Sequence, residues 1–118
     1  MRRVALLLAF VLAFIGPTFG QPATVLNPED VQKGHFLATM ICGICHLAAP
    51  DKPAEPIMRP PAPSFASIVQ HKTFDAASLT HFLTTTHRGL DNPQGMSNPD
   101  LMDYQIKQIV AYFLSLYQ

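Results

Sequence analysis

The stretch Cys42-Gly43-Ile44-Cys45-His46 sets the strongest constraint on what this chain can fold around. Its spacing is C-x-x-C-H, the pattern through which proteins attach haem covalently. Each thiol can add across one vinyl group of the haem to form a thioether, and two intervening residues let both thiols reach from one tight turn. His46 then lies beneath the ring, where its imidazole can bind the iron. The pattern predicts one haem c, attached through Cys42 and Cys45 and ligated by His46.

Cys42 and Cys45 are the only cysteines in the chain, so other uses of such a pair have to be weighed. An exported pair can form a simple disulfide or a thioredoxin-like redox couple. The redox couple needs a βαβ context, and no strand-rich segment is visible. A structural zinc ion needs four ligands, of which this turn would supply three and a distant histidine the fourth. We favour haem attachment, with thiol–disulfide chemistry and zinc as the alternatives.

Residues 1–20 have the layout of a secretory signal peptide. Arg2-Arg3 precedes 12 apolar residues, 4–15, and Gly16-Pro17 ends that run. The run is shorter than the about 20 residues that span a bilayer, so it does not read as a membrane anchor. In Thr18-Phe19-Gly20, small residues occupy the third and first positions before the expected cleavage bond. We expect cleavage near Gly20, export to the periplasm and a mature protein with no membrane span.

Composition narrows the function classes of the mature chain. The full chain has 118 residues, of which 8 are basic and 8 acidic, and removal of Arg2 and Arg3 leaves a net charge of about −2. Nucleic-acid-binding domains carry a clear basic excess, so we expect no nucleic-acid partner. A mature chain of about 98 residues has a thin core of its own, and a covalently bound group could complete it.

The hydrophobic periodicity of the mature chain predicts helices and no strands. After a linker of residues 21–26, one domain of residues 27–118 is expected to hold four helical segments. These run from the N-cap Asn27 to about Ile41, from Ser64 to Val69, from the N-cap Asp75 to about Thr86, and from Asp100 or Leu101 to Leu116. The last segment has the clearest amphipathic stripe. The fold class is therefore all-α.

Apolar residues at helical spacing give three of these segments an inward face. They are Val31, Gly34, Leu37, Ala38 and Ile41 in the first, Leu79, Phe82 and Leu83 in the third, and Ile106, Ile109, Val110, Phe113 and Leu114 in the last.

A proline-rich connection of residues 50–63 follows the C-x-x-C-H turn. Six prolines in 14 residues exclude a regular helix or a central strand. Too little chain lies on either side for this stretch to link two separate cores. We expect a stiff loop along the proximal edge of the haem, with a proline carbonyl accepting the Nδ1 proton of His46. Pro61 and Pro63 are the two candidates.

The second axial position on the iron can be filled by Met or His, or left open. Met96 is the best candidate, because it lies in an irregular loop between glycine and proline, just before the last helix. His87 and Met102 are alternatives. Core packing is the competing interpretation of Met40 and Met102, since methionine fills gaps well. The remaining candidates have weaker claims, Met58 because it lies in the proximal loop, and His35, His71 and His81 because lone histidines are mostly surface or satisfied residues.

In their order along the chain these features resemble the class I cytochrome c family. Gly34 stands eight residues before Cys42, the C-x-x-C-H turn and the proline-containing loop follow, and Met96 to Leu101 leads into a terminal helix. The resemblance implies three to five helices wrapped around one covalent haem, with the first and last helices crossing at Gly34 and Tyr112. Two positions differ from the family's usual pattern: Ala38 replaces a frequent aromatic residue, and Met102 a frequent Ser or Thr.

The resemblance implies an exported single-electron carrier rather than an enzyme. Its iron would keep both His46 and Met96 as ligands in both oxidation states, and would exchange electrons with transient redox protein partners. Water would be kept from the iron by apolar packing from Phe65, Phe82, Ile109 and Phe113. One alternative is a dedicated electron-transfer subunit of an exported dehydrogenase or oxidase, which a large exposed apolar patch would favour. Another is a haem enzyme or gas sensor, which needs an open or labile sixth position.

Overall fold

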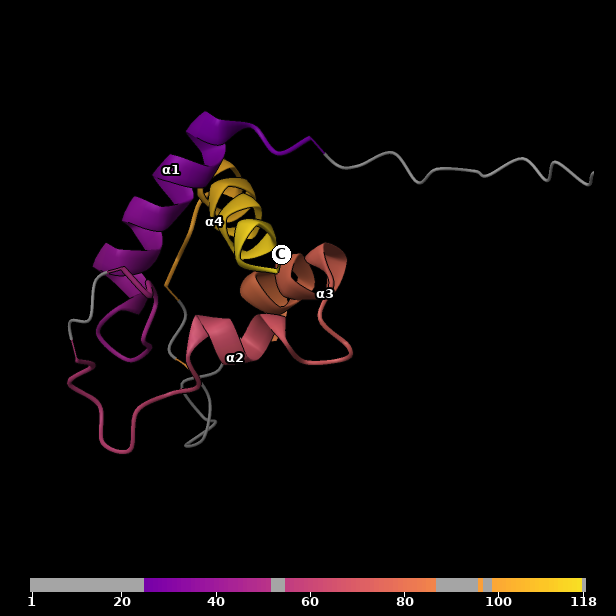
Figure 1. Cartoon of the computed structure of the whole chain (residues 1–118). Coiled ribbons are helices and arrows are strands. Elements are labelled where there is room, and N and C mark those ends of the chain that lie inside the picture. The colour runs from indigo at the N-terminus through magenta and orange to yellow at the C-terminus, as the bar shows by residue number, and fades with distance from the viewer. Residues whose placement is uncertain (1–24, 52–54, 87–95, 97–98, 118) are drawn as a thin grey trace, which may run out of the picture.

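Helices make up most of the structure, a computed structural model that describes residues 25–51, 55–86, 96 and 99–117. Their order is α1 (Pro28–Leu37), η1 (Ala38–Cys42), α2 (Phe65–Val69), α3 (Ala76–His81), η2 (Phe82–Thr86) and α4 (Asp103–Leu116), where η denotes π-helix. Within the described ranges there is no strand, only an isolated parallel bridge between His46 and Ala62. The all-α prediction is confirmed for this part of the chain (Figure 1).

Several expectations concern residues outside those ranges. The signal peptide (1–20), residues 21–24 of the linker, and the alternative ligand His87 all lie outside the described residues. Among the helices that are described, none has both the length and the apolar character needed to cross a membrane.

The first helix forms as its sequence predicts. The Asn27 side chain accepts a hydrogen bond from the backbone N–H of Glu29 at 2.9 Å, and Pro28 occupies the first helical position. The helix then continues through η1 to Cys42, one residue beyond the expected end. Gly34 and Ala38 are buried, which confirms the predicted inward face.

Both middle helices have side-chain caps: the predicted Asp75, and Ser64, which was expected to be the first helical residue and instead caps a helix that begins at Phe65. Ser64 and Asp75 accept hydrogen bonds from the backbone N–H groups three residues later, at 3.1 and 2.8 Å. Leu79 and Leu83 are buried, but Phe82 is 40% exposed, so its assignment to the inward face was wrong. Phe82 is the first residue of the π-helical segment η2, where the 3.6-residue periodicity on which the assignment relied no longer holds.

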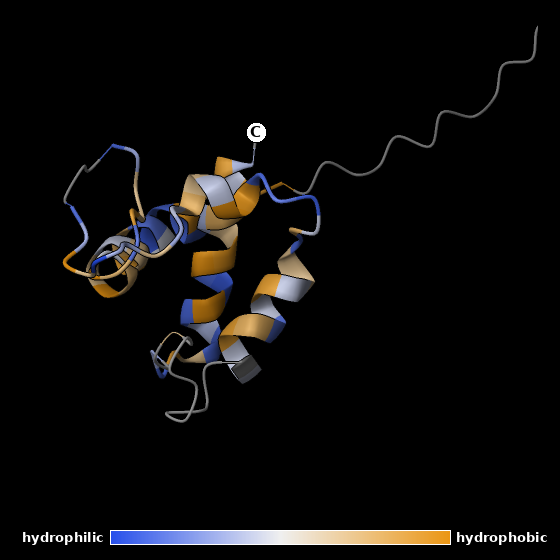
Figure 2. Ribbon diagram, turned by 90° about the horizontal axis from the view of Figure 1, so that it is seen from below, coloured by the Kyte–Doolittle hydropathy of each residue, from blue (hydrophilic) through white to orange (hydrophobic). Residues whose placement is uncertain are grey.

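The last helix begins later than predicted. Asp100 has a φ of 51°, a left-handed conformation that cannot start a right-handed helix. The expected start at Asp100 or Leu101 was therefore wrong by two to three residues. Met102 is the N-cap, and its backbone N–H donates to the side-chain oxygen of Gln105 at 2.9 Å. The amphipathic stripe is confirmed, and Figure 2 shows hydrophobic and hydrophilic residues alternating along this helix.

The closest helix–helix approach joins α1 to α4. A Cβ added at Gly34 would lie 1.9 Å from the carbonyl oxygen of Gln108 and 2.9 Å from the Cβ of Tyr112, so only glycine permits this separation. The crossing therefore involves the two residues that the sequence indicated, Gly34 and Tyr112. Ala38, one turn further along, is completely buried. A small residue thus fills the position where the family often has an aromatic ring.

The rest of the core lies between α4 and the two middle helices. The rings of Phe65 and Phe113 pack with their centroids 4.1 Å apart, and Phe74 stacks on Phe113 at 6.0 Å. Ile109 is 1% exposed at the centre of this cluster. Helix α4 thereby connects α1 on one side with α2 and α3 on the other (Figure 1).

Candidate haem site

The C-x-x-C-H residues form one tight turn at the end of η1. The backbone N–H of Gly43 donates to the carbonyl of Ala38 at 3.0 Å, which closes the last π turn. The carbonyl of Cys42 then accepts from the N–H groups of both Cys45 and His46, at 3.1 and 2.9 Å. The two thiols and the imidazole are therefore held on a single turn of backbone, as covalent attachment to one flat group requires.

Gly43 is a structural requirement of this turn that the sequence analysis missed. A Cβ added there would lie 2.4 Å from the carbonyl oxygen of Thr39, a contact that real side chains do not make. The signal was available, because one of the two residues between the cysteines is glycine, the residue that allows the closest approach of backbone.

The proline-rich loop lies against the turn. The N–H groups of Ile57 and Ala62 donate to the carbonyls of Ile44 and Cys45, both at 2.9 Å. His46 Nδ1 is 2.7 Å from the carbonyl oxygen of Pro63. Of the two candidate prolines, Pro63 rather than Pro61 makes this bond. Because a carbonyl can only accept, Nδ1 is the nitrogen of His46 that carries the proton.

The other nitrogen of His46 faces the sulfur of Met96. The two atoms, Nε2 and Sδ, are 3.4 Å apart, although 50 residues separate them in the chain. In the neutral tautomer with its proton on Nδ1, the ring presents a lone pair at Nε2, and a thioether has no proton to donate. In that tautomer two electron-pair donors face each other, whereas a doubly protonated ring would donate a hydrogen bond from Nε2 to the sulfur. A metal ion, as an acceptor of electron pairs, would satisfy the lone pairs of the neutral ring and of the thioether together.

The surroundings of His46 suit a ligand to iron. The imidazole is 8% exposed, and the ring of Phe65 packs against it with centroids 5.4 Å apart. A metal bound to both atoms needs about 4.3 Å between them, taking bond lengths of about 2.0 Å to nitrogen and 2.3 Å to sulfur as for zinc. The flexible Met96 side chain would have to withdraw by about 1 Å, a small adjustment for an unbranched thioether.

The cysteines do not resemble a thioredoxin-like pair. Both thiols are free, and burial, together with the neighbouring Cys45, raises the pKa of Cys42 to about 11. Redox-active cysteines have lowered pKa values, because the thiolate is the reactive form. The structure gives the zinc alternative no support either: the described residues hold no cluster of three or more His, Cys, Asp or Glu side chains that could bind a metal ion.

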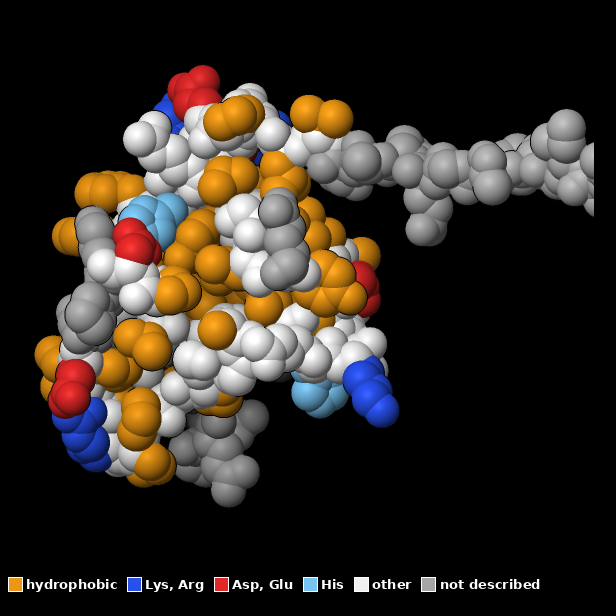
Figure 3. All heavy atoms as spheres, in the orientation of Figure 1, with side chains coloured by type: hydrophobic (Ala, Val, Ile, Leu, Met, Phe, Trp, Pro, Cys, Tyr) orange, Lys and Arg blue, Asp and Glu red, His pale blue; other side chains and the backbone are white. Residues whose placement is uncertain are grey.

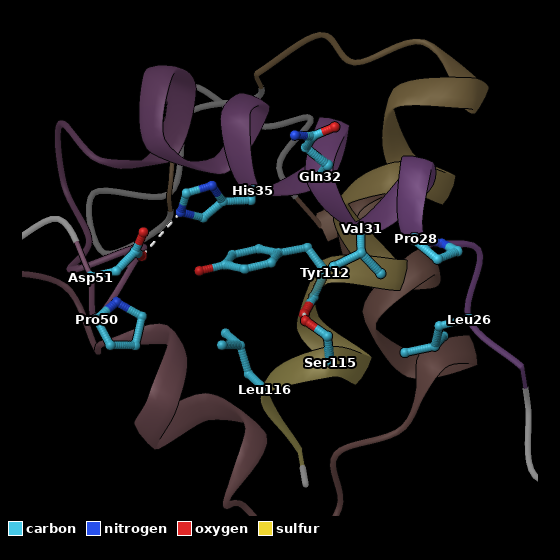
Figure 4. Close-up of a pocket in the computed structure, with 10 residues that line it drawn as sticks. All are labelled: Leu26, Pro28, Val31, Gln32, His35, Pro50, Asp51, Tyr112, Ser115 and Leu116. Carbon is cyan, nitrogen blue, oxygen red and sulfur yellow. Dashed lines mark hydrogen bonds and ion pairs between the residues drawn. The ribbon is translucent and has the colours of Figure 1, made fainter.

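The alternative histidine ligands in the described residues have other neighbours. His35 Nε2 lies 3.0 Å from Asp51 Oδ1, and the His35 ring packs edge-on against Tyr112 with centroids 5.1 Å apart. Figure 4 shows this arrangement beside an open cavity of about 630 Å³. His71 Nδ1 is 2.9 Å from the Thr73 hydroxyl, and His81 is exposed. None of these contacts involves Met96 or the C-x-x-C-H turn.

Two of the methionines are exposed rather than packed in the core. Met40 and Met102 are each 62% exposed, so the core-packing interpretation of both was wrong. Met40 lies on the side of η1 away from the buried Ala38, and Met102 precedes α4 as its N-cap. Met58, in the proximal loop, is 42% exposed. Met96, by contrast, is half-buried and in contact with His46.

Comparison with known proteins gives no independent identification: no protein-family model, curated protein or solved structure matches the chain. The assignment of this site therefore depends on the residues themselves, and above all on the geometry of Cys42, Cys45, His46 and Met96.

Proposed function

We propose that the protein is an exported monohaem c-type cytochrome that carries single electrons between redox partners. The observation that carries the proposal is the opposition of His46 Nε2 and Met96 Sδ at 3.4 Å, beside a turn that presents two free cysteines. A histidine nitrogen and a methionine sulfur that face each other are the pair of side chains that ligate haem iron in electron-carrying cytochromes c.

Each residue of the site has a separate task in this proposal. Cys42 and Cys45 form the thioethers, and the high pKa of the Cys42 thiol keeps it protonated until attachment. The Pro63 carbonyl holds the Nδ1 proton of His46, which orients the ring and makes Nε2 a better electron donor. Met96 occupies the opposite side and keeps other ligands out. The haem itself supplies the reversible one-electron couple.

Apolar packing around His46 excludes water from the site. Phe65, Ile109 and Phe113 are each 3% exposed or less, and the first of these rings lies directly against the imidazole. Phe82, which we had expected to share this task, is too exposed to do so. A dry environment of this kind restricts the ligand rearrangements that would slow electron transfer.

The test is the visible spectrum of mature protein made with a haem-attachment system. We expect sharp reduced bands that carbon monoxide leaves unchanged, a far-red iron–sulfur band in the oxidised form, and haem that resists extraction with acid and acetone. A ready shift with carbon monoxide would replace this proposal with a haem enzyme or gas sensor. Extractable haem, or none, would return the cysteine pair to thiol–disulfide chemistry.

A further inference from the structure

An exposed hydrophobic surface surrounds the candidate haem-attachment turn. We define the apolar face as the side chains of Phe36, Met40, Ile44 and Ile57. Their exposed fractions are 60%, 62%, 55% and 80%. Phe36, Met40 and Ile44 follow each other at intervals of four residues along α1, η1 and the turn, while the backbone of Ile57 is bonded to that of Ile44. Figure 3 shows hydrophobic side chains along this flank of the molecule.

This face points away from the protein's own core. At 100° per residue, Phe36 and Met40 lie on the opposite side of the helical segment from Gly34 and Ala38, which are buried against α4. The core therefore cannot cover them. Ile44 lies between the two cysteines, so the apolar face is continuous with the backbone that would carry the haem.

Two cations among the described residues near this face are each paired with a carboxylate. Lys33, one turn before Phe36, is paired with Glu29 at 2.6 Å, and Arg59 is paired with Glu55 at 3.3 Å. On the α4 side, a groove of about 450 Å³ continues from Phe36 to Tyr104. Apart from Lys33, the polar side chains that line the groove are uncharged: Gln32, Gln105 and Gln108.

The composition is that of a protein interface. Interface cores are depleted in charged residues and enriched in aromatic residues and Met, whereas their rims are polar. Phe36 and Met40 match the core, and the three glutamines match the rim. A partner with a charged docking surface would lose hydration against the four apolar side chains, and to gain an ion pair with Lys33 or Arg59 it would have to compete with the carboxylate that each already contacts. An uncharged, apolar partner surface has no charged groups whose hydration would be lost on docking.

We propose that the apolar face is the docking surface for a redox partner protein whose own contact surface is apolar and uncharged. The inference rests on the proposed function, since it takes the partner to approach the attached haem past Ile44. Binding through such surfaces depends little on ionic strength, in contrast to docking steered by charge.

The experiment uses the haem-loaded protein and a gold electrode coated with methyl-terminated alkanethiol as the probe for an apolar partner surface. Electrodes with carboxylate- and ammonium-terminated coatings serve as charged probes. We expect fast electron exchange on the methyl surface, unchanged between low and high salt. Met40→Lys and Ile57→Lys should each slow it by about tenfold, because a charge must then be desolvated. Val25→Lys, the same change at a residue 92% exposed and before α1, should leave it unchanged.

Three results would overturn the docking proposal while leaving the carrier intact. They are faster exchange on a charged coating with strong salt dependence, unaltered exchange in Met40→Lys and Ile57→Lys, and an equal loss in Val25→Lys. Sedimentation that shows a dimer dissociated by Met40→Lys would assign the face to a second copy of this chain instead. Failure of the carrier itself is recognised separately, by the absence of a covalent haem spectrum in solution.

Discussion

The first helical segment makes two different kinds of junction, one at its middle and one at its C-terminal end. At Gly34 the segment packs directly against α4. The contact is so close that a Cβ at Gly34 would lie 1.9 Å from the carbonyl oxygen of Gln108. At Cys42–His46 the segment ends in a turn that carries two free thiols and an imidazole nitrogen facing a thioether sulfur. The contact at Gly34 is made by protein atoms alone. The turn at Cys42–His46 would need the proposed haem to complete it, and substitutions can test this difference.

The largest effect is expected from removing both attachment thiols. Cys42→Ser with Cys45→Ser should abolish acid-resistant haem completely, because no thioether can form. The measurement is haem retained on the polypeptide after denaturation, compared with Met102→Leu, a change at an exposed residue outside the turn. Haem that stays covalently attached to the double variant would show that the second junction has been assigned to the wrong residues.

Replacing the sulfur ligand should open one side of the site. In Met96→Ala, the reduced protein should bind carbon monoxide and the oxidised protein should lose the far-red band, because no other described side chain contacts His46 Nε2. The reduction potential should fall, since Met ligation raises it. The matched control is Met102→Ala, which removes the other methionine that precedes α4 closely in the chain. If the control binds carbon monoxide and Met96→Ala does not, Met102 is the ligand.

A substitution at the α1–α4 crossing should lower the stability of the protein and leave its haem spectrum unchanged. In Gly34→Ala, the new methyl group meets backbone at Gln108, which cannot move aside as a side chain could. Overpacking of this kind costs about 1–3 kcal/mol, and each kcal/mol lowers the melting temperature of a small domain by about 4–8 °C. Thermal unfolding followed by circular dichroism measures the loss.

A second glycine sharpens that comparison. Gly43→Ala also places a methyl group against backbone, at Thr39, but within the attachment turn. It should reduce the yield of covalent haem more than Gly34→Ala does. Equal attachment yields in the two variants would mean that the two junctions are not separate.

The smallest effect is expected at Tyr112, which joins the crossing to the loop after His46. Its hydroxyl donates to the carbonyl of Ala48 at 3.0 Å, a buried hydrogen bond whose loss in Tyr112→Phe should cost about 1 kcal/mol. Denaturant unfolding at neutral pH measures the loss. Tyr117→Phe, at an exposed residue, is the control and should change stability little.

Alkaline pH gives Tyr112 a second signature. Burial, with Asp51 nearby, raises the pKa of Tyr112 to about 12 from its ordinary value of 10.0. The unfolded chain therefore loses its proton first as the pH rises, and the folded protein loses stability progressively between pH 10.0 and about 12. Tyr112→Phe should lack this loss. A control measured with the cysteines in thioether form avoids titration of the Cys42 thiol.

Much of the fold could be predicted because its signals are local. The caps Asn27, Ser64 and Asp75 act within three residues, so the sequence around them suffices to place the helix starts. The start of α4 was missed because Asp100 adopts a left-handed conformation, which aspartate tolerates but its sequence does not require. Phe82 was misplaced because the change to π geometry is not visible in a 3.6-residue pattern.

Spacing along the chain was enough to predict the helical segments, the tight turn at Cys42–His46 and the short list of possible ligands. Tertiary packing selected Pro63 over Pro61, brought Met96 to within 3.4 Å of His46, and left Phe36 and Met40 facing outward. These outcomes join residues far apart in the chain or depend on which side of a helix is covered. They follow from how the helices pack, which no local pattern specifies.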